Sequence, residues 1–335
     1  MRSPYLRAER ILVIRLTSYA ASHRINIVTS PASDQSSRPS WAAIALIGVI
    51  TIFWGVNFPS IKIAVSEFPV WTFRVICVIC GATAMLGIGS LILGHSPFVA
   101  KGERRKAALA GLCNIGGFQL CVAFGLMVVD AGRGTIIAYT MPLWATIFAT
   151  IFLGERLTFT RILGLFIGLS GLLVLIGPGL TTLGASFNGT LLLLAAAVLW
   201  GAGTVLIKSQ NWTTPVIILT GWQFIFGGIP ILLGMLLFET GVEIGPISTK
   251  AWLAVAYSAL VPMIICHLVW YTLIGMLPAS IAAISTLAIP IVGVYSSAIL
   301  LGERVGTREW LALCLVVCAL AIVLVPPSDW RRKKR

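Results

Sequence analysis

Charged residues are scarce in this chain. Of its 335 residues only 10% are charged, whereas an ordinary soluble domain carries about 25%. A chain of this size with so few charges cannot cover its own surface in water, and its mean hydropathy of +0.98 agrees. This scarcity excludes a soluble globular enzyme, a disordered protein and a nucleic-acid binder, and it indicates a membrane protein.

A cysteine framework and catalytic motifs are also missing. The seven cysteines are an odd number and all lie in apolar runs, so disulfides are not expected. Cys77 and Cys80 form a CxxC without a second pair, which favours packing over metal or redox chemistry. The sequence has no HExxH, no nucleophile–base pair and no carboxylate cluster. We therefore expect no enzyme activity, no catalytic residue, no metal and no cofactor.

Long apolar runs fill most of the chain. Each is about 20 residues long, which is enough for a helix to cross roughly 30 Å of hydrocarbon. Helices are predicted because every backbone polar group inside a membrane must be satisfied within the chain. The predicted spans are 41–63, 70–93, 106–128, 134–153, 161–177, 188–208, 214–238, 250–274, 279–300 and 309–325.

Positive charge at both ends predicts the orientation. Residues 1–40 are rich in arginine, and the chain ends RRKKR at 331–335. Excess Lys and Arg marks cytoplasmic segments, so both tails, 1–40 and 326–335, and the Lys101–Lys106 loop are placed inside. We expect a multi-pass protein of the bacterial cytoplasmic (inner) membrane with both termini cytoplasmic. An interfacial amphipathic helix is the alternative for the first tail.

Two stretches of the sequence repeat. WGVNFPSIK at 54–62 returns 146 residues later as WGAGTVLIK, and LGER at 153–156 returns 148 residues later at 301–304. Pro142 pairs with Pro290 at the same offset of 148. The chain is thus two five-helix units, 41–177 and 188–325. Because five is odd, the units enter the membrane in opposite directions, an arrangement typical of secondary transporters. The predicted fold class is an all-α membrane protein with ten transmembrane helices as two inverted repeats.

The small residues, the proline and then LGER before a last helix form a fairly specific pattern. With WGVNFPSIK and FPVWTFR at 68–74, it resembles the EamA-like branch of the drug/metabolite transporter superfamily. The resemblance implies a central cavity, export or exchange of small metabolites, and a pathway flanked by the helices of Pro142 and Pro290. It also implies that Arg74 matches the family's second-helix pattern. One departure is Ile289, where family members often carry Glu. That departure and the absence of a buried glutamate from span one count against proton-coupled export of cationic drugs.

Polar and aromatic side chains within the spans are candidates for lining that cavity. Polar groups in lipid are costly and usually face the bundle interior, where bonding between helices is the alternative to substrate contact. His267 titrates near neutrality, so proton transfer is a further alternative for it. For the aromatic residues the alternatives are interfacial belts and scaffold packing. The substrate-binding candidates are Trp54, Asn57, Arg74, Gln119, Tyr139, Trp200, Gln223, His267 and Tyr271, with Asn114 and Trp222 beside them.

The cations, the prolines and the loop glutamates are expected to have other roles. Lys62, Arg74 and Lys208 lie near helix ends, where they either snorkel to headgroups or contact an anionic substrate group. Pro142 and Pro290 are placed in the middle of their helices, as hinges or as simple kinks. The LGER glutamates Glu155 and Glu303 are expected to form local ion pairs with Arg156 and Arg304, and Gly164, Gly168 and Gly171 to allow close helix packing.

The sequence therefore predicts a secondary transporter, an exporter or exchanger of a small metabolite that works by alternating access. An amino acid or a related zwitterionic or anionic compound is the expected substrate, because no span carries a carboxylate for a cation. The alternative is a membrane-embedded enzyme or sensor on a transporter scaffold. The expected partners are the small-molecule substrate and membrane lipid, not nucleic acid, with a homodimer left open.

Overall fold

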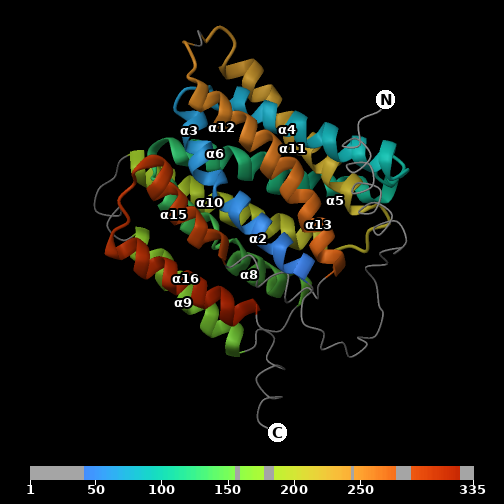
Figure 1. Ribbon diagram of the computed structural model, residues 1–335. Coiled ribbons are helices and arrows are strands. Elements are labelled where there is room, and N and C mark those ends of the chain that lie inside the picture. The colour runs from blue at the N-terminus through green and yellow to red at the C-terminus, as the bar shows by residue number, and fades with distance from the viewer. Residues whose placement is uncertain (1–40, 155–158, 177–184, 243–244, 277–287, 325–335) are drawn as a thin grey trace.

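The computed structural model describes residues 41–154, 159–176, 185–242, 245–276 and 288–324 (Figure 1). Regular structure within these residues is helical, without a strand. Seven helical segments are long and apolar enough to cross a membrane, so the chain is a multi-pass membrane protein. They are Trp41–Val65, Val70–Ile92, Lys101–Val128, Ala131–Leu153, Ser186–Lys208, Val216–Phe238 and Thr249–Trp270.

Three further predicted spans fall on α9 (Phe159–Ile176), α15 (Ile289–Leu301) and α16 (Thr307–Leu324). That these three helices also cross the membrane, which would make ten crossings, stays a prediction. The tails, Glu155, Arg156, and the start of the predicted span 279–300 lie outside the described residues.

Spans three and eight each contain a π-helical turn. In span three, η3 (Leu112–Gly117) separates α5 (Arg104–Gly111) from α6 (Phe118–Val128). In span eight, η5 (Val261–Cys266) separates α12 (Thr249–Leu260) from α13 (His267–Met276). Pro262 has no N–H to continue the α-helical ladder. Since π-turns are rare, their recurrence 149 residues apart is a structural trace of the repeat.

Span four is broken rather than bent. It consists of α7 (Ala131–Ala138) and α8 (Met141–Leu153), with Tyr139 and Thr140 between them. Pro142 lies in the first turn of α8, where a missing N–H costs no intrahelical hydrogen bond. Pro290 likewise lies in the first turn of α15. The prediction that both prolines sit in the middle of a helix was wrong, because each lies in the first turn of a helix.

Span one has a smaller irregularity with the same cause. It consists of α2 (Trp41–Gly55) and α3 (Asn57–Val65), and Pro59 cannot donate to the Gly55 carbonyl four residues earlier. The Ser296 hydroxyl of α15 lies 3.4 Å from that carbonyl oxygen and 3.1 Å from the Gly293 carbonyl oxygen of its own helix, so the two acceptors share one donor. A helix of the second repeat thus offers a shared donor to the carbonyl that Pro59 leaves without its helical partner.

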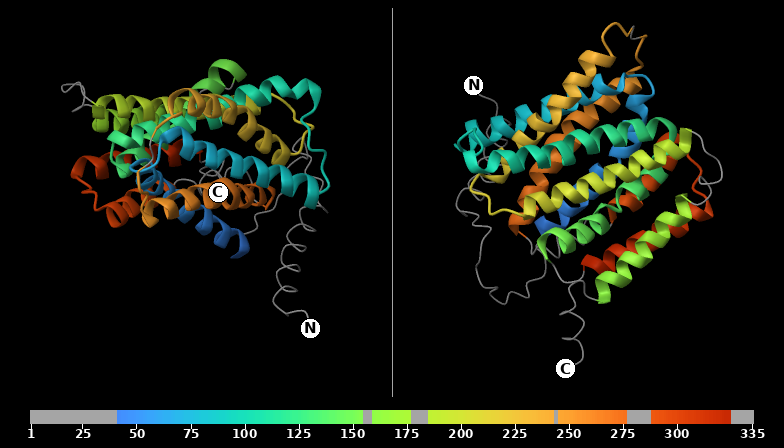
Figure 2. Two further views of the ribbon diagram at one scale, coloured as in Figure 1. Left: turned by 90° about the horizontal axis from the view of Figure 1, so that it is seen from above. Right: turned by 180° about the vertical axis from the view of Figure 1, so that it is seen from behind.

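The fifth helix of each repeat packs against its counterpart. α9 and α16 lie side by side at one edge of the bundle (Figures 1 and 2). A Cβ added at Gly168 would meet Leu143 and lie 3.1 Å from Ala319 Cβ, and one at Gly171 would lie 3.0 Å from Leu315 Cβ. The predicted role of Gly168 and Gly171 in close packing is confirmed.

Two long helices of the second repeat pack on the first. α10 (Ala185–Lys208) lies beside α6 and α8, and α11 (Val216–Phe238) lies beside α4 (Val70–Gly87), as Figure 2 shows. Glycine permits such approaches, since a Cβ at Gly125 of α6 would lie 3.0 Å from the Gly189 carbonyl oxygen of α10. The two repeats therefore share one core.

Glutamates join helix ends across the repeats. Glu239 accepts hydrogen bonds from the backbone N–H of Trp71 and Thr72, at 2.9 and 2.7 Å, in the first turn of α4. The N-terminal amides of a helix lack intrahelical partners and carry partial positive charge, so a carboxylate is stabilised there. Three other glutamates bond the start of a helix in the other repeat: Glu67 at Ser248, Glu103 at Thr213 and Thr214, and Glu303 at Ala131 and Gly132.

These contacts also define the two ends of the bundle. Glu67, Glu239 and Glu303 lie at one end, together with Lys62, and Glu103 lies at the other. The expected local pair of Glu303 with Arg304 was wrong: among the described residues, the ion pairs of the structure join Lys62 to Asp130 and to Glu303.

Candidate substrate-binding site

Arg74 is a buried cation without a protein counter-ion in the part of the chain that the structure describes. It lies one turn into α4, and none of its surface is exposed. Its three guanidinium nitrogens have no oxygen or nitrogen acceptor there, and its neighbours are the Cys77 thiol and the Phe73 ring, 4.7 Å away. Arg74 does not snorkel to the headgroups, because it faces the interior of the bundle.

Three neighbouring helices also carry polar atoms that are poorly satisfied. Asn57 Oδ1 on α3 and Ser258 Oγ on α12 are buried without a hydrogen-bond partner among the described residues. On α6, Gln119 donates from Nε2 to the Met263 thioether at 3.3 Å, and a thioether is a weak acceptor. Each buried polar atom without a partner calls for an explanation, and a bound ligand or water is the usual one.

Three of these residues share a level in the bundle, and Arg74 lies nearer the Lys62 end. α3 and α4 pack against each other, and each also packs against α6 and α12. Asn57, Gln119 and Ser258 each lie eight or nine residues from the Lys62 end of their helices, a depth of about 12–14 Å. Arg74 lies four residues from the same end. The four side chains therefore come from helices that surround one region.

Aromatic candidates pack across the repeats. Trp54 lies against His267, with ring centroids 6.0 Å apart, and Trp200 lies against Phe118 at 4.7 Å. The Nδ1 of His267 is 2.8 Å from the Pro262 carbonyl oxygen and so carries the proton as the donor. These contacts show that Trp54, Trp200 and His267 pack within the bundle, and their substrate contact stays a prediction.

The remaining candidates are dispersed. Tyr139 lies at the α7–α8 break with its ring 6.0 Å from that of Phe58, next to Asn57 in the chain. Gln223 accepts a hydrogen bond from Asn114 at 3.3 Å, which fits the interhelical alternative. Tyr271 lies on α13, but its side chain is outside the described residues.

The lysines of the repeated motif differ. Lys62 donates to the Val129 carbonyl oxygen at 2.6 Å and lies 3.4 Å from Asp130 and 3.7 Å from Glu303. The Lys62 ammonium therefore reaches protein oxygens in this structure, and its contact with a substrate stays a prediction. Lys208, its counterpart, is exposed at the other end of the bundle.

Comparison with known proteins adds the family to this geometry. The pattern of the EamA-like transporter family matches residues 40–177 and again residues 187–325, which together are most of the chain. The chain belongs to the EamA-like transporter family. Transport is thus the general function of the protein, and the family and its relatives are transporters rather than enzymes.

Bacterial relatives align with this transporter over most of their length. It is 24% identical to the transporter YoaV of Bacillus subtilis, over 82% of this chain and 94% of that protein. It is 27% identical to a probable amino-acid metabolite efflux pump of Escherichia coli, over 82% of this chain and 92% of that pump. It is 26% identical to the inner membrane transporter YedA of Escherichia coli, over 81% and 87%.

A solved crystal structure has the same fold. The TM-score is 0.62 at 19% sequence identity, with 88% of this chain and 99% of the other covered. This likeness concerns the fold alone.

Sequence reasoning missed Ser258 in the transporter. A single serine in an apolar helix bonds the preceding turn in most cases, so it carries no signal. Ser258 lies four residues before Pro262, which has no N–H to donate to the Ser258 carbonyl, and this spacing is the signal that could have found it.

Proposed function

We propose that the chain is a secondary transporter that exports or exchanges a small metabolite by alternating access. Amino acids and related zwitterionic or anionic compounds are the proposed substrates. The observation that carries this proposal is Arg74, fully buried and without a protein carboxylate or other oxygen acceptor among the described residues.

A buried guanidinium needs an anion. Arginine stays protonated in proteins, and an uncompensated buried charge costs several kcal/mol. Within the seven described spans the only acid is Glu103, in the first turn of span three at the other end of the bundle. A substrate carboxylate supplies the missing charge and accepts paired hydrogen bonds from the planar guanidinium.

The neighbouring atoms complement an amino group. Asn57 Oδ1 and Ser258 Oγ are acceptors without donors, so they suit the ammonium of a zwitterion whose carboxylate lies at Arg74. The side-chain amide of Gln119 is a further polar group, and its hydrogen bond to the Met263 thioether is weak. The site proposed for the substrate is therefore Arg74, Asn57, Gln119 and Ser258, with Tyr139 beside it.

The relatives support the same substrate class. Two of them, from Escherichia coli and Salmonella typhimurium, are named as probable amino-acid metabolite efflux pumps. At 26–27% identity this supports amino acids as the first compounds to test. The basic tails support cytoplasmic termini, and the bacterial relatives support the inner membrane.

The test is flux in proteoliposomes with labelled amino acids, organic anions and organic cations. For a carboxylate substrate, Arg74→Gln should weaken apparent affinity by about ten-fold or more, because a charge-assisted hydrogen bond contributes roughly 1.5–3 kcal/mol. Arg74→Lys should retain part of the affinity, since it keeps the charge without the planar fork.

Stability separates binding from structure in this test. Arg74→Gln removes an unpaired buried charge, so thermal unfolding should occur at an equal or higher temperature than in the parent protein. The exposed Arg105, without a contact in the described structure, provides the matched control Arg105→Gln, which should change neither property. Normal flux in Arg74→Gln, or transport of organic cations alone, would contradict the proposal.

A further inference from the structure

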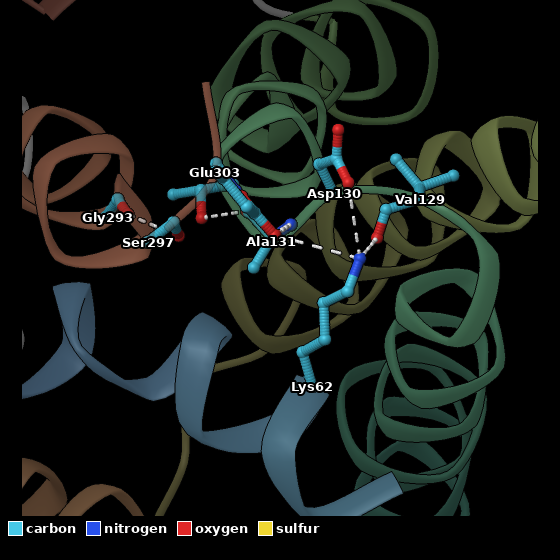
Figure 3. A network of polar contacts seen from close by, with 9 residues as sticks. Lys62, Val129, Asp130, Ala131, Gly293, Ser297 and Glu303 are labelled. Atoms are coloured by element: carbon cyan, nitrogen blue, oxygen red, sulfur yellow. Dashed lines mark hydrogen bonds and ion pairs between the residues drawn. The ribbon is translucent and has the colours of Figure 1, made fainter. Parts of the chain in front are cut away.

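A carboxylate of the second repeat holds a helix of the first (Figure 3). Glu303 follows Gly302, which ends α15 with a φ of +68° that glycine adopts without strain. Its two oxygens accept hydrogen bonds from the backbone N–H of Ala131 and Gly132, at 2.7 and 2.9 Å. These are the first two amides of α7, where negative charge is stabilised.

Lys62 ties a third element to this contact. Its ammonium reaches the Val129 carbonyl, Asp130 and Glu303, as Figure 3 shows. We name Lys62, Asp130, Glu303 and the two α7 amides the end cluster. The end cluster connects α3, the turn before α7, and the loop after α15, so it joins both repeats at one end of the bundle.

Beneath the end cluster, α15 lies against α7 and α2 through small residues. A Cβ at Gly293 of α15 would touch the Thr135 side chain of α7, and one at Gly55 of α2 would lie 2.6 Å from Val292 Cβ. Such surfaces approach closely because they present little side chain. They also part without interlocked large side chains having to rearrange.

The end cluster lies above the proposed substrate site. Lys62 is five residues from Asn57 on α3, about 7–8 Å along the helix. From the end cluster, α7 runs down to Tyr139, whose ring faces Phe58. Arg74 and Ser258 are 0% and 1% exposed. Both are therefore closed to this end in the structure, and the end cluster holds α3, α7 and α15 together there.

At the other end of the bundle, the repeat counterpart of Glu303 is Glu155, which lies outside the described residues. Lys208 occupies the position of Lys62 in the second copy, and its side chain is exposed. Alternating access requires that one end open while the other is closed. We propose that the end cluster is a latch, which closes the Lys62 end of the transporter and breaks once in each transport cycle. This inference rests on the proposed function.

A disulfide tests whether the latch must open. A Cβ at Gly132 would lie 3.6 Å from Ser297 Cβ, within the disulfide range of about 3.5–4.5 Å. In a cysteine-free background, oxidation of Gly132→Cys/Ser297→Cys should stop flux, and a reductant should restore it. Each single variant under the same oxidant is the control and should keep its flux. Undiminished flux in the fully cross-linked protein overturns the latch.

Thiol labelling tests the latch without a substrate. Thr135→Cys, buried beneath the end cluster, is labelled with an impermeant reagent applied to each side of the membrane separately. Glu303→Gln should raise the labelling rate from the Lys62 side by at least about five-fold, because it weakens charge-assisted hydrogen bonds. Lys62→Met should raise it in the same direction and serves if Glu303→Gln does not fold.

Glu239→Gln is the matched control for labelling. Glu239 also bonds the start of a helix at the same end, but the helix is α4 rather than α7, so the labelling rate should not change. Unchanged labelling in Glu303→Gln and Lys62→Met, with lower thermal stability, would show a static helix cap and overturn the latch. Absence of flux in every protein would contradict the proposed function, while labelling would still decide the latch.

Discussion

The ring of His267 lies edge-on to that of Trp54, with centroids 6.0 Å apart and planes at 87°. Phe118 and Trp200 also pack ring against ring, with centroids 4.7 Å apart and planes tilted at 58°. Trp54 and Trp200 share a position in the repeat, and His267 and Phe118 each follow a π-helical turn. In both pairs a tryptophan of one repeat packs on a ring of the other. The phenyl ring of Phe118 therefore takes the same packing role as the imidazole of His267.

We therefore expect His267→Phe to fold and to transport. The exchange keeps an aromatic ring and loses one hydrogen bond to the Pro262 carbonyl oxygen, so it should cost about 1 kcal/mol of stability. Thermal unfolding in detergent and the pH profile of flux are the measurements. If flux disappears while folding is normal, His267 carries a proton in the cycle and does more than pack.

The sequence predicted the equivalence of Trp54 and Trp200 but not their partners. An offset between two motifs fixes positions within a repeat, whereas the neighbour of a side chain depends on which helices pack together. The partner of Glu303 was missed for a similar reason. The free amides that it bonds belong to the start of α7, and backbone amides leave no residue-type signal in a sequence.

Glu67 provides a pH-dependent contact at the Lys62 end. Hydrogen bonds from the backbone N–H and the hydroxyl of Ser248 lower the pKa of the Glu67 carboxyl. Because the pKa is lower in the folded protein, this contribution to stability is complete above the ordinary glutamate pKa of about 4.3. It is lost as the pH falls through the folded value.

Glu67→Gln should therefore unfold at a lower temperature than the parent protein at pH 7, and the difference should vanish as the pH falls below about 4. Thermal unfolding across this pH range measures it. Lys250→Gln, which removes a weaker neighbouring charge, is the comparison and should have the smaller effect. A difference that stays constant from pH 7 to pH 3 contradicts the assignment.

The burial of Arg74 could not be predicted from the sequence. Its position near the start of α4 fits both a snorkelling side chain and an interior one. The helix is apolar on all faces, so periodicity does not say which face is interior. Only packing against α11 and α12 decides that Arg74 is buried.

Pro142 is expected to matter for transport more than for folding. It begins α8 directly after the break at Tyr139 and Thr140, and alanine there would supply the N–H that lets α7 and α8 join into one helix. Pro142→Ala should keep normal membrane expression and slow flux. Pro290→Ala at the start of α15 should do the same, since it holds the equivalent position. Normal flux in both variants would mean that the two prolines are structural only.

The last prediction concerns which end faces the cytoplasm. Ser66 and Ser96 are exposed at opposite ends of span two, and the basic residues Lys101, Arg104, Arg105 and Lys106 crowd the Ser96 end. Since cytoplasmic loops carry the excess of Lys and Arg, the Ser96 end should be inside and the Lys62 end outside. In a cysteine-free background, an impermeant thiol reagent should label Ser66→Cys in intact cells and Ser96→Cys only after permeabilisation. The reverse pattern would mean that the protein has the opposite orientation in the membrane. The end cluster, with Lys62 and Glu303, would then lie at the cytoplasmic face.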